Sequence, residues 1–341
     1  MKYAVSTLCF TVLVLVTAAQ QTFTNPLLPA GADPWVIQKD GFYYYTHTLG
    51  NKLVIWKTKN IAEIDKAVFK TVWVPPDSTL YSKQIWAPEL HFLKGKWYMY
   101  FAADDGKNAN HRLYVIENSS PDPLQGDWIF KGQISDKTNK WAIDGSVFKY
   151  RGKHYITWSG WEGDTNGRQD IYIAKLKNPW TIKGARVRIS SPVLPWEKIG
   201  DLNDANNPPH VDVNEGPQFL ANDKKLFLVY SASGCWTDQY ALGMLQFTGK
   251  RNLLDSSAWH KSTEPVFKQS VSNKVYAPGH NSFFKSASGK EDWILYHANA
   301  QPGQGCGRNR SPRAQKFSWN ADGTPNFGQP VKAGEVLQIP E

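Results

Sequence analysis

Three features are scarce or missing in this sequence, and each one narrows the class of protein. Beyond the first 16 residues, no stretch approaches the roughly 20 apolar residues that a membrane-spanning helix needs, so we expect no membrane association. Lys and Arg are scattered, without a basic run or a recognition-helix pattern, so no nucleic-acid partner is expected. Helical periodicity is absent except around residues 61–68, which favours an all-β fold with one short helical turn.

The net charge of +9 has two interpretations. The simpler one is a solvated surface. The alternative is attraction to an acidic polymer such as pectin, which would raise the rate of encounter without a specific contact.

Aromatic residues, in contrast, are abundant, with 15 Trp, 15 Tyr and 16 Phe. Strands favour aromatic side chains on half-buried surfaces. Carbohydrate sites also favour them, because the C–H face of a sugar packs on a ring. The excess therefore indicates a β-rich protein and is compatible with sugar binding.

The first residues have the pattern of a secretory signal peptide. A positive start at Lys2 is followed by the apolar run 5–16 and by the small residues of a cleavage site at 17–20. We therefore predict a signal peptide at residues 1–19 and a secreted product comprising residues 20–341.

One hairpin design recurs five times along the mature chain. Each copy has a polar residue, an apolar strand, a tight polar turn and an aromatic second strand, and a third strand follows. Repeats at intervals of about 50–70 residues with three or four strands each are typical of propeller blades. We therefore predict a five-bladed β-propeller, because the alternative, a β-sandwich, gives no reason for five similar hairpins. The five copies begin near residues 33, 89, 144, 215 and 280.

Cysteine is scarce, and only two residues of this type remain once Cys9 leaves with the signal peptide. Cys235 and Cys306 each follow the second strand of a hairpin, in the fourth and fifth repeats. Export to an oxidising compartment and an even count favour a disulfide between them, and two buried free thiols are the alternative. The sequon at Asn118 predicts a glycosylated surface turn.

Carboxylates begin three of the repeats. Asp33, Asp144 and Glu215 open the first, third and fourth copies, at positions that we take to be equivalent. An isolated Asp before Pro or Gly is usually a turn residue. In a propeller, however, the first strands line one channel, so the three carboxylates are expected to face one another at its mouth.

Five motifs begin the repeats: Ala32-Asp33-Pro34, Trp86-Ala87-Pro88-Glu89, Ile143-Asp144-Gly145-Ser146, Asn214-Glu215-Gly216-Pro217 and Pro278-Gly279-His280-Asn281-Ser282. They resemble the blade signatures of glycoside hydrolase family 43. The closing run Arg310-Ser311-Pro312-Arg313-Ala314-Gln315 through Asp322-Gly323-Thr324-Pro325, with Ser233-Gly234-Cys235-Trp236, is most similar to the exo-acting α-L-arabinofuranosidase branch of that family. The family consists of inverting enzymes on a five-bladed β-propeller. The resemblance implies that Asp33 is the general base, Glu215 the general acid, and Asp144 the residue that raises the pKa of the acid.

Three further residues are candidates for the site. The resemblance implies that His280 helps to hold a hydrated calcium or sodium ion at the propeller centre, whereas a lone His is otherwise usually structural. Trp86 is a candidate sugar contact, with hairpin packing as its alternative. Arg310 is a candidate contact to a sugar hydroxyl, with loop solvation as its alternative. No organic cofactor is expected.

The resemblance implies an enzyme that releases L-arabinose from α-1,5-linked arabinan or arabino-oligosaccharides. The predicted signal peptide indicates that it is secreted, and we expect a monomer. A β-xylosidase or an endo-arabinanase would use the same three carboxylates, because this machinery does not specify the leaving group. A carbohydrate-binding propeller without catalysis is a third hypothesis, but a lectin needs neither an acid nor a base.

Overall fold

The computed structural model describes residues 21–205, 207–223 and 225–341. Throughout these ranges the regular elements are β-strands and short 3₁₀ segments, which confirms the all-β prediction. The predicted signal peptide at residues 1–19 lies outside the described residues. The 3₁₀ segments are η1 (Ile61–Lys66), η2 (Asn108–Asn110), η3 (Pro195–Glu197) and η4 (Ser256–Ala258).

Antiparallel four-stranded sheets form the first part of the chain, and in each one the strands are neighbours in sequence order. The first contains β2 (Ala32–Lys39), β3 (Phe42–Thr48), β4 (Leu53–Thr58) and β5 (Val68–Trp73). The second contains β6 (Lys83–Leu93), β7 (Lys96–Asp104), β8 (Arg112–Asn118) and β9 (Ile129–Ile134).

The middle of the chain forms an eight-stranded sheet from two antiparallel groups of four strands. A short parallel pairing of β12 with β14 joins the two groups. The first group is β10 (Ala142–Tyr150), β11 (Lys153–Gly160), β12 (Arg168–Asn178) and β13 (Thr181–Ser190). The second is β14 (Asp212–Ala221), β15 (Leu226–Ala232), β16 (Ala241–Phe247) and β17 (Trp259–Lys261).

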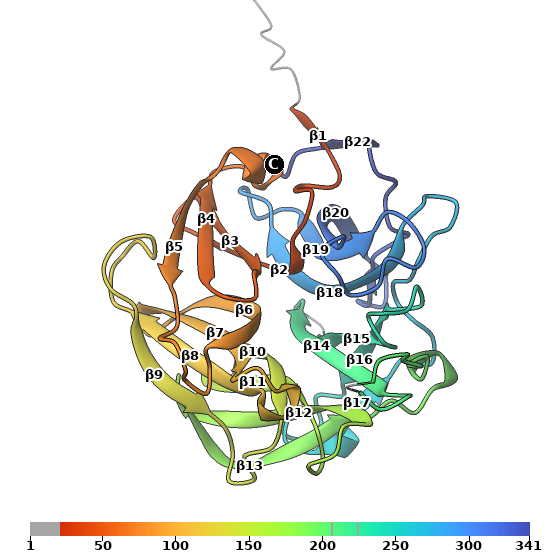
Figure 1. Ribbon diagram of the computed structural model, residues 1–341. Helices are drawn as coiled ribbons and strands as arrows, with labels where there is room; N and C mark the ends of the chain where they lie inside the picture. The colour runs from red at the N-terminus through yellow and green to blue at the C-terminus, as the bar shows by residue number, and fades with distance from the viewer. Residues whose placement is uncertain (1–20, 206, 224) are drawn as a thin grey trace, which may run out of the picture.

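The final sheet completes a circle of strand groups, and the two ends of the described chain meet beside it (Figure 1). This sheet contains β18 (Tyr276–Lys285), β19 (Asp292–Asn299), β20 (Ser311–Trp319) and β21 (Pro325–Asn326). β1 (Thr22–Thr24) pairs with β22 (Val336–Gln338), which the sequence analysis did not predict. In Figure 1, β2, β6, β10, β14 and β18 lie nearest the centre.

Tight turns fix the register of the first three hairpins. Each connects its strands through two residues, and both have positive φ: Asp40-Gly41, Lys94-Gly95 and Arg151-Gly152. Positive φ at both positions is the signature of a type I′ turn, whose twist matches that of paired strands. The turn therefore fixes which residue of the first strand stands at its inner end.

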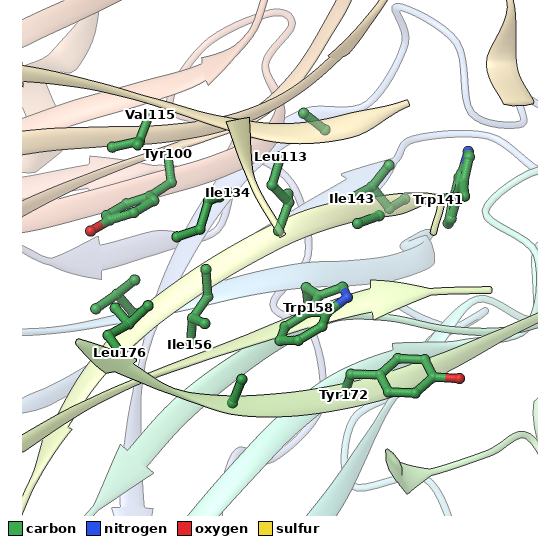
Figure 2. Packing of buried hydrophobic residues seen from close by; sticks show 14 of the residues in the cluster. Tyr100, Leu113, Val115, Ile134, Trp141, Ile143, Ile156, Trp158, Tyr172 and Leu176 are labelled. Carbon is green, nitrogen blue, oxygen red and sulfur yellow. The ribbon is translucent and has the colours of Figure 1, made fainter. Parts of the chain in front are cut away.

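Apolar side chains fill the space between neighbouring strand groups rather than a single central core. Figure 2 shows one such cluster, in which Tyr100 and Leu113 of the second sheet pack with Ile156 and Trp158 of the next group. Packing between groups fixes the angle of one group to the next. This arrangement leaves the inner ends of the first strands free for polar side chains.

Candidate active site

The inner end of each first strand carries the same backbone irregularity. Register shifts occur after Ala32, Trp86, Ile143, Glu215 and Gly279. The residue after each of these has positive φ: Asp33 at 56°, Ala87 at 44°, Asp144 at 58°, Gly216 at 56° and His280 at 46°. A non-glycine residue in this region costs about 1–3 kcal/mol and persists only where its surroundings hold it, which is common at functional sites.

This register corrects one expectation from the sequence. Asp33 and Asp144 occupy equivalent positions, as predicted, and His280 shares this position in its strand. Glu215, however, lies one residue earlier, in the position of Trp86. The prediction that all three carboxylates are equivalent is therefore wrong for Glu215. Gly216 takes the equivalent position instead, and a Cβ atom there would lie 3.3 Å from Nδ1 of His280, so a glycine leaves room for that ring.

The structure brings the three carboxyl groups together although they come from three strand groups. Asp33 and Glu215 are each 9% exposed and Asp144 is 3% exposed. Asp144 is linked directly to the strand that carries Glu215, because its Oδ2 accepts a hydrogen bond of 2.9 Å from the backbone N–H of Gly216.

Positive and hydrogen-bonding groups surround the Asp33 carboxylate. Arg310 Nη1 lies 3.0 Å from Oδ1, Thr48 donates a 2.6 Å hydrogen bond to Oδ2, and His280 Nδ1 lies 3.4 Å from Oδ1. Burial alone would raise the pKa of Asp33, but the charge of Arg310, together with the hydrogen bond from Thr48, lowers it well below its usual value. Asp33 is therefore ionised at any working pH.

Glu215 and Asp144 have the opposite tendency. Burial raises the pKa of Glu215 to about 7, with a further increase from the charge of Asp33. Burial and then the charge of Glu215 raise the pKa of Asp144 well above its usual value. The site thus combines one permanently ionised carboxylate with a pair that retains a proton near neutral pH.

Tyr240 and His297 also belong to this site, and the sequence analysis missed both. The Tyr240 hydroxyl donates a 2.7 Å hydrogen bond to Oε1 of Glu215. The backbone N–H of Asp33 donates a 3.0 Å hydrogen bond to Nδ1 of the buried His297. Neither residue begins a repeat, and no motif singles them out among the many aromatic residues of this chain.

Trp86 and Arg310 have different surroundings: Trp86 stacks on another aromatic ring, whereas Arg310 contacts one of the carboxylates. Trp86 is partly buried and stacks on His111, with ring centroids 4.0 Å apart, and His111 Nδ1 lies 3.0 Å from Oδ2 of the buried Asp104. The Trp86 ring therefore has a rigid support. Arg310 contacts Asp33 directly, so loop solvation does not describe its environment.

Some of these residues could take part in holding a cation. Burial lowers the pKa of His280, and the charges of Asp33 and Glu89 offset this only in part. The ring is therefore neutral near neutral pH and can offer a lone pair to a cation. Within the described ranges, no three His, Cys, Asp or Glu side chains are grouped closely enough to form a metal site by themselves. The residues fit an ion that takes most of its ligands from water.

The predicted disulfide is confirmed. Cys235 and Cys306 are bonded, with 5.1 Å between their Cα atoms, and the bond links the loop after β15 to the loop after β19. The two loops are also joined by a 2.8 Å hydrogen bond from the backbone N–H of Gly303 to Asp238.

The prediction of an exposed sequon at Asn118 is wrong. Asn118 ends β8, is 1% exposed, and donates a 2.7 Å hydrogen bond from Nδ2 to the carbonyl oxygen of Gln125. Its Oδ1 accepts the backbone N–H of Ser120, so the side chain closes a turn. A glycan on Nδ2 does not fit this folded arrangement.

Neighbouring carboxyl groups in different protonation states are typical of the active sites of glycoside hydrolases. Residues 23–325 match the family described as "Glycosyl hydrolases family 43". The chain belongs to this family.

Several known proteins are similar to this chain. An "Extracellular exo-alpha-(1->5)-L-arabinofuranosidase" from Streptomyces avermitilis is 40% identical over 322 residues, which cover 92% of this chain but 64% of that protein. A protein of the same description from Streptomyces chartreusis is 35% identical and covers 81% of this chain and 82% of its own. The crystal structure of an α-L-arabinofuranosidase from Lactobacillus brevis has a TM-score of 0.83 at 37% identity, covering 92% of this chain and 98% of that one.

Proposed function

We propose that this chain is a secreted, inverting exo-α-L-arabinofuranosidase that releases L-arabinose from α-1,5-linked arabinan or arabino-oligosaccharides. The observation that carries the proposal is the contrast between Asp33, which Arg310 keeps ionised, and Glu215, which burial keeps protonated near neutral pH. An inverting hydrolase needs one carboxyl group in each state. The names of the relatives from Streptomyces support the choice of substrate.

The proposed mechanism is a single displacement. Asp33 takes a proton from a water molecule, whose oxygen attacks the anomeric carbon. Glu215 gives its proton to the departing glycosidic oxygen as that bond breaks. Asp144 opposes early loss of this proton, because two neighbouring negative charges resist coexistence. Arg310 holds Asp33 in place, and Trp86 offers a supported ring for a sugar face.

For the fold, we propose that residues 20–341 form one catalytic domain, a five-bladed β-propeller that acts as a monomer. The five successive groups of four strands support this, since each would form one blade, with the two groups of the middle sheet counted as separate blades.

The described residues contain no helix of the length and apolar character that spanning a membrane requires.

Product analysis on debranched α-1,5-arabinan tests the substrate and the mode of cleavage. Arabinose as the sole product from the earliest time point is the expected result. A ladder of oligosaccharides would indicate an endo-arabinanase, and activity on xylosides instead of arabinofuranosides would indicate a β-xylosidase. No turnover of any of these substrates would favour a binding protein without catalysis.

The pH profile follows from the two protonation states. We expect kcat/KM on an arabino-oligosaccharide to fall about tenfold per pH unit above pH 7, because Glu215 must be protonated and its pKa is about 7. Asp144→Asn removes a like charge, so the same limb should move to lower pH. Initial rates measured from pH 5 to pH 9 check this. A limb that stays in place in Asp144→Asn would contradict the role given to Asp144.

For the ion, we propose that His280 holds a hydrated calcium or sodium ion. A cation bound only by the folded chain stabilises it by mass action. Melting temperature should therefore fall after thorough removal of calcium and recover when calcium or sodium is added back. His280→Gln should melt at a temperature that is independent of either ion, and the same dependence in this variant would exclude His280 as the ligand.

A further inference from the structure

A tyrosine hydroxyl contacts the carboxyl group that we propose as the acid. Tyr240 is 1% exposed, and its hydroxyl donates a 2.7 Å hydrogen bond to Oε1 of Glu215. Burial and the charge of Glu215 raise the pKa of Tyr240 well above its usual value, so this hydroxyl keeps its proton and remains a donor. An oxygen that accepts this bond is a poor place for the proton of Glu215, which is therefore directed to Oε2.

The Tyr240 ring fills a space that the repeat leaves empty. Gly279 occupies the position in its strand that Glu215 and Trp86 occupy in theirs. A Cβ atom on Gly279 would lie 2.0 Å from Cε1 of Tyr240. On another side the ring lies parallel to the imidazole of His297, with centroids 5.8 Å apart and planes 5° apart. The fifth repeat thus has a glycine at this position, and the ring of a tyrosine from the fourth repeat occupies the space that a side chain would fill.

We propose that Tyr240 is a positioning residue for proton donation by Glu215. Its hydroxyl holds Oε1, keeps the transferable proton on Oε2, and stabilises the carboxylate that forms when this proton passes to the departing oxygen. Tyr240 keeps its own proton throughout. This inference rests on the proposed role of Glu215 as the general acid.

Other charged groups also act on Glu215 and set the direction of the effect. Asp33 from β2 opposes its ionisation, whereas Arg310 from the loop before β20 favours it. Asp144 from β10 is the neighbouring carboxyl group whose own pKa the charge of Glu215 raises. The hydrogen bond from Tyr240 also favours the ionised form. Loss of this bond should make Glu215 a weaker acid.

Tyr240→Phe removes the hydroxyl and keeps the ring. We expect kcat on α-1,5-arabinotriose to fall about tenfold to a hundredfold, in the range seen for loss of a preorganised donor or of efficient proton transfer. KM should change little, and the alkaline limb of the pH profile should move to higher pH. The rate on 2,4-dinitrophenyl α-L-arabinofuranoside should change far less, since this leaving group departs without a proton.

A second variant displaces the Tyr240 hydroxyl while Tyr240 itself stays unaltered. Gly279→Ala forces the Tyr240 ring to move, so it should show the same selective loss on arabinotriose and the same shift of the limb. Tyr98→Phe is the matched control, because Tyr98 is a buried tyrosine that donates a 2.6 Å hydrogen bond to Glu117, in another sheet. It should alter the melting temperature and leave the pH profile unchanged.

Two results would overturn the proposal. One is an equal loss on both substrates in Tyr240→Phe, and the other is an alkaline limb that does not move in either Tyr240→Phe or Gly279→Ala. Glu215→Gln, measured beside them, separates this failure from that of the proposed function. If Glu215→Gln loses activity selectively on arabinotriose while Tyr240→Phe does not, the acid is assigned correctly and only the role of Tyr240 is wrong.

Discussion

Asp33→Asn should lower kcat on every substrate by about 10²- to 10⁴-fold, the range that a general base contributes. An amide cannot accept a proton from water, and every substrate needs that step. Arabinotriose and 2,4-dinitrophenyl α-L-arabinofuranoside should therefore be slowed to a similar extent. Initial rates on both, with a melting curve to verify folding, provide the measurement.

Asp40→Asn is the matched control for this variant. Asp40 belongs to the same hairpin but lies exposed in its turn, and its positive φ suits Asn as well as Asp. Its activity should equal that of the unaltered chain. Partial recovery of Asp33→Asn by added azide, which attacks in place of water, would support the role of the base, and an unaltered rate in Asp33→Asn would refute it.

Glu215→Gln should separate substrates by their leaving group. With arabinotriose, kcat should fall by about 10²- to 10⁴-fold, because the departing sugar needs a proton. With the dinitrophenyl substrate, the loss should stay within about tenfold, because dinitrophenolate departs unaided. The alkaline limb assigned to Glu215 should also disappear from the pH profile.

Glu117→Gln controls for the loss of a buried carboxylate away from the site, since Glu117 is 4% exposed in β8. It should alter stability and leave the ratio of the two rates unchanged. Proton NMR at early times should show product of inverted anomeric configuration. Retention of configuration, or equal slowing of both substrates in Glu215→Gln, would show that the acid and the base are assigned wrongly.

Local pattern was sufficient to predict the first three strands of each repeat and the tight turns. The turn at Asp40-Gly41, for example, follows from residues that tolerate positive φ between two apolar runs. The disulfide was also predictable, because each cysteine follows the second strand of its hairpin, and neighbouring repeats of one design are expected to bring such loops together. The turns depend on residues that are close in the sequence, and the disulfide follows from the repeat of one hairpin design.

Apart from the disulfide, the contacts between side chains of different repeats could not be predicted. The bulge that moves Glu215 one residue away from the position of Asp33 depends on how β14 pairs with β15, and its motif does not reveal the offset. Tyr240 reaches Glu215 only because Gly279, in another strand group, has no side chain. The pattern Asn118-Ser119-Ser120 describes a recognition site for glycosylation but not the burial of its first residue.

The disulfide joins two loops that each supply a partner to one carboxylate. Tyr240, which contacts Glu215, follows Cys235 closely, and Arg310, which contacts Asp33, follows Cys306 closely. If Asp33 and Glu215 act as proposed, the redox state of the surroundings should affect how well these two groups are aligned, in addition to the stability of the fold. Protein made in a reducing cytosol should have a lower kcat even where it is soluble and compact. Mild reoxidation after purification should restore kcat without a refolding step.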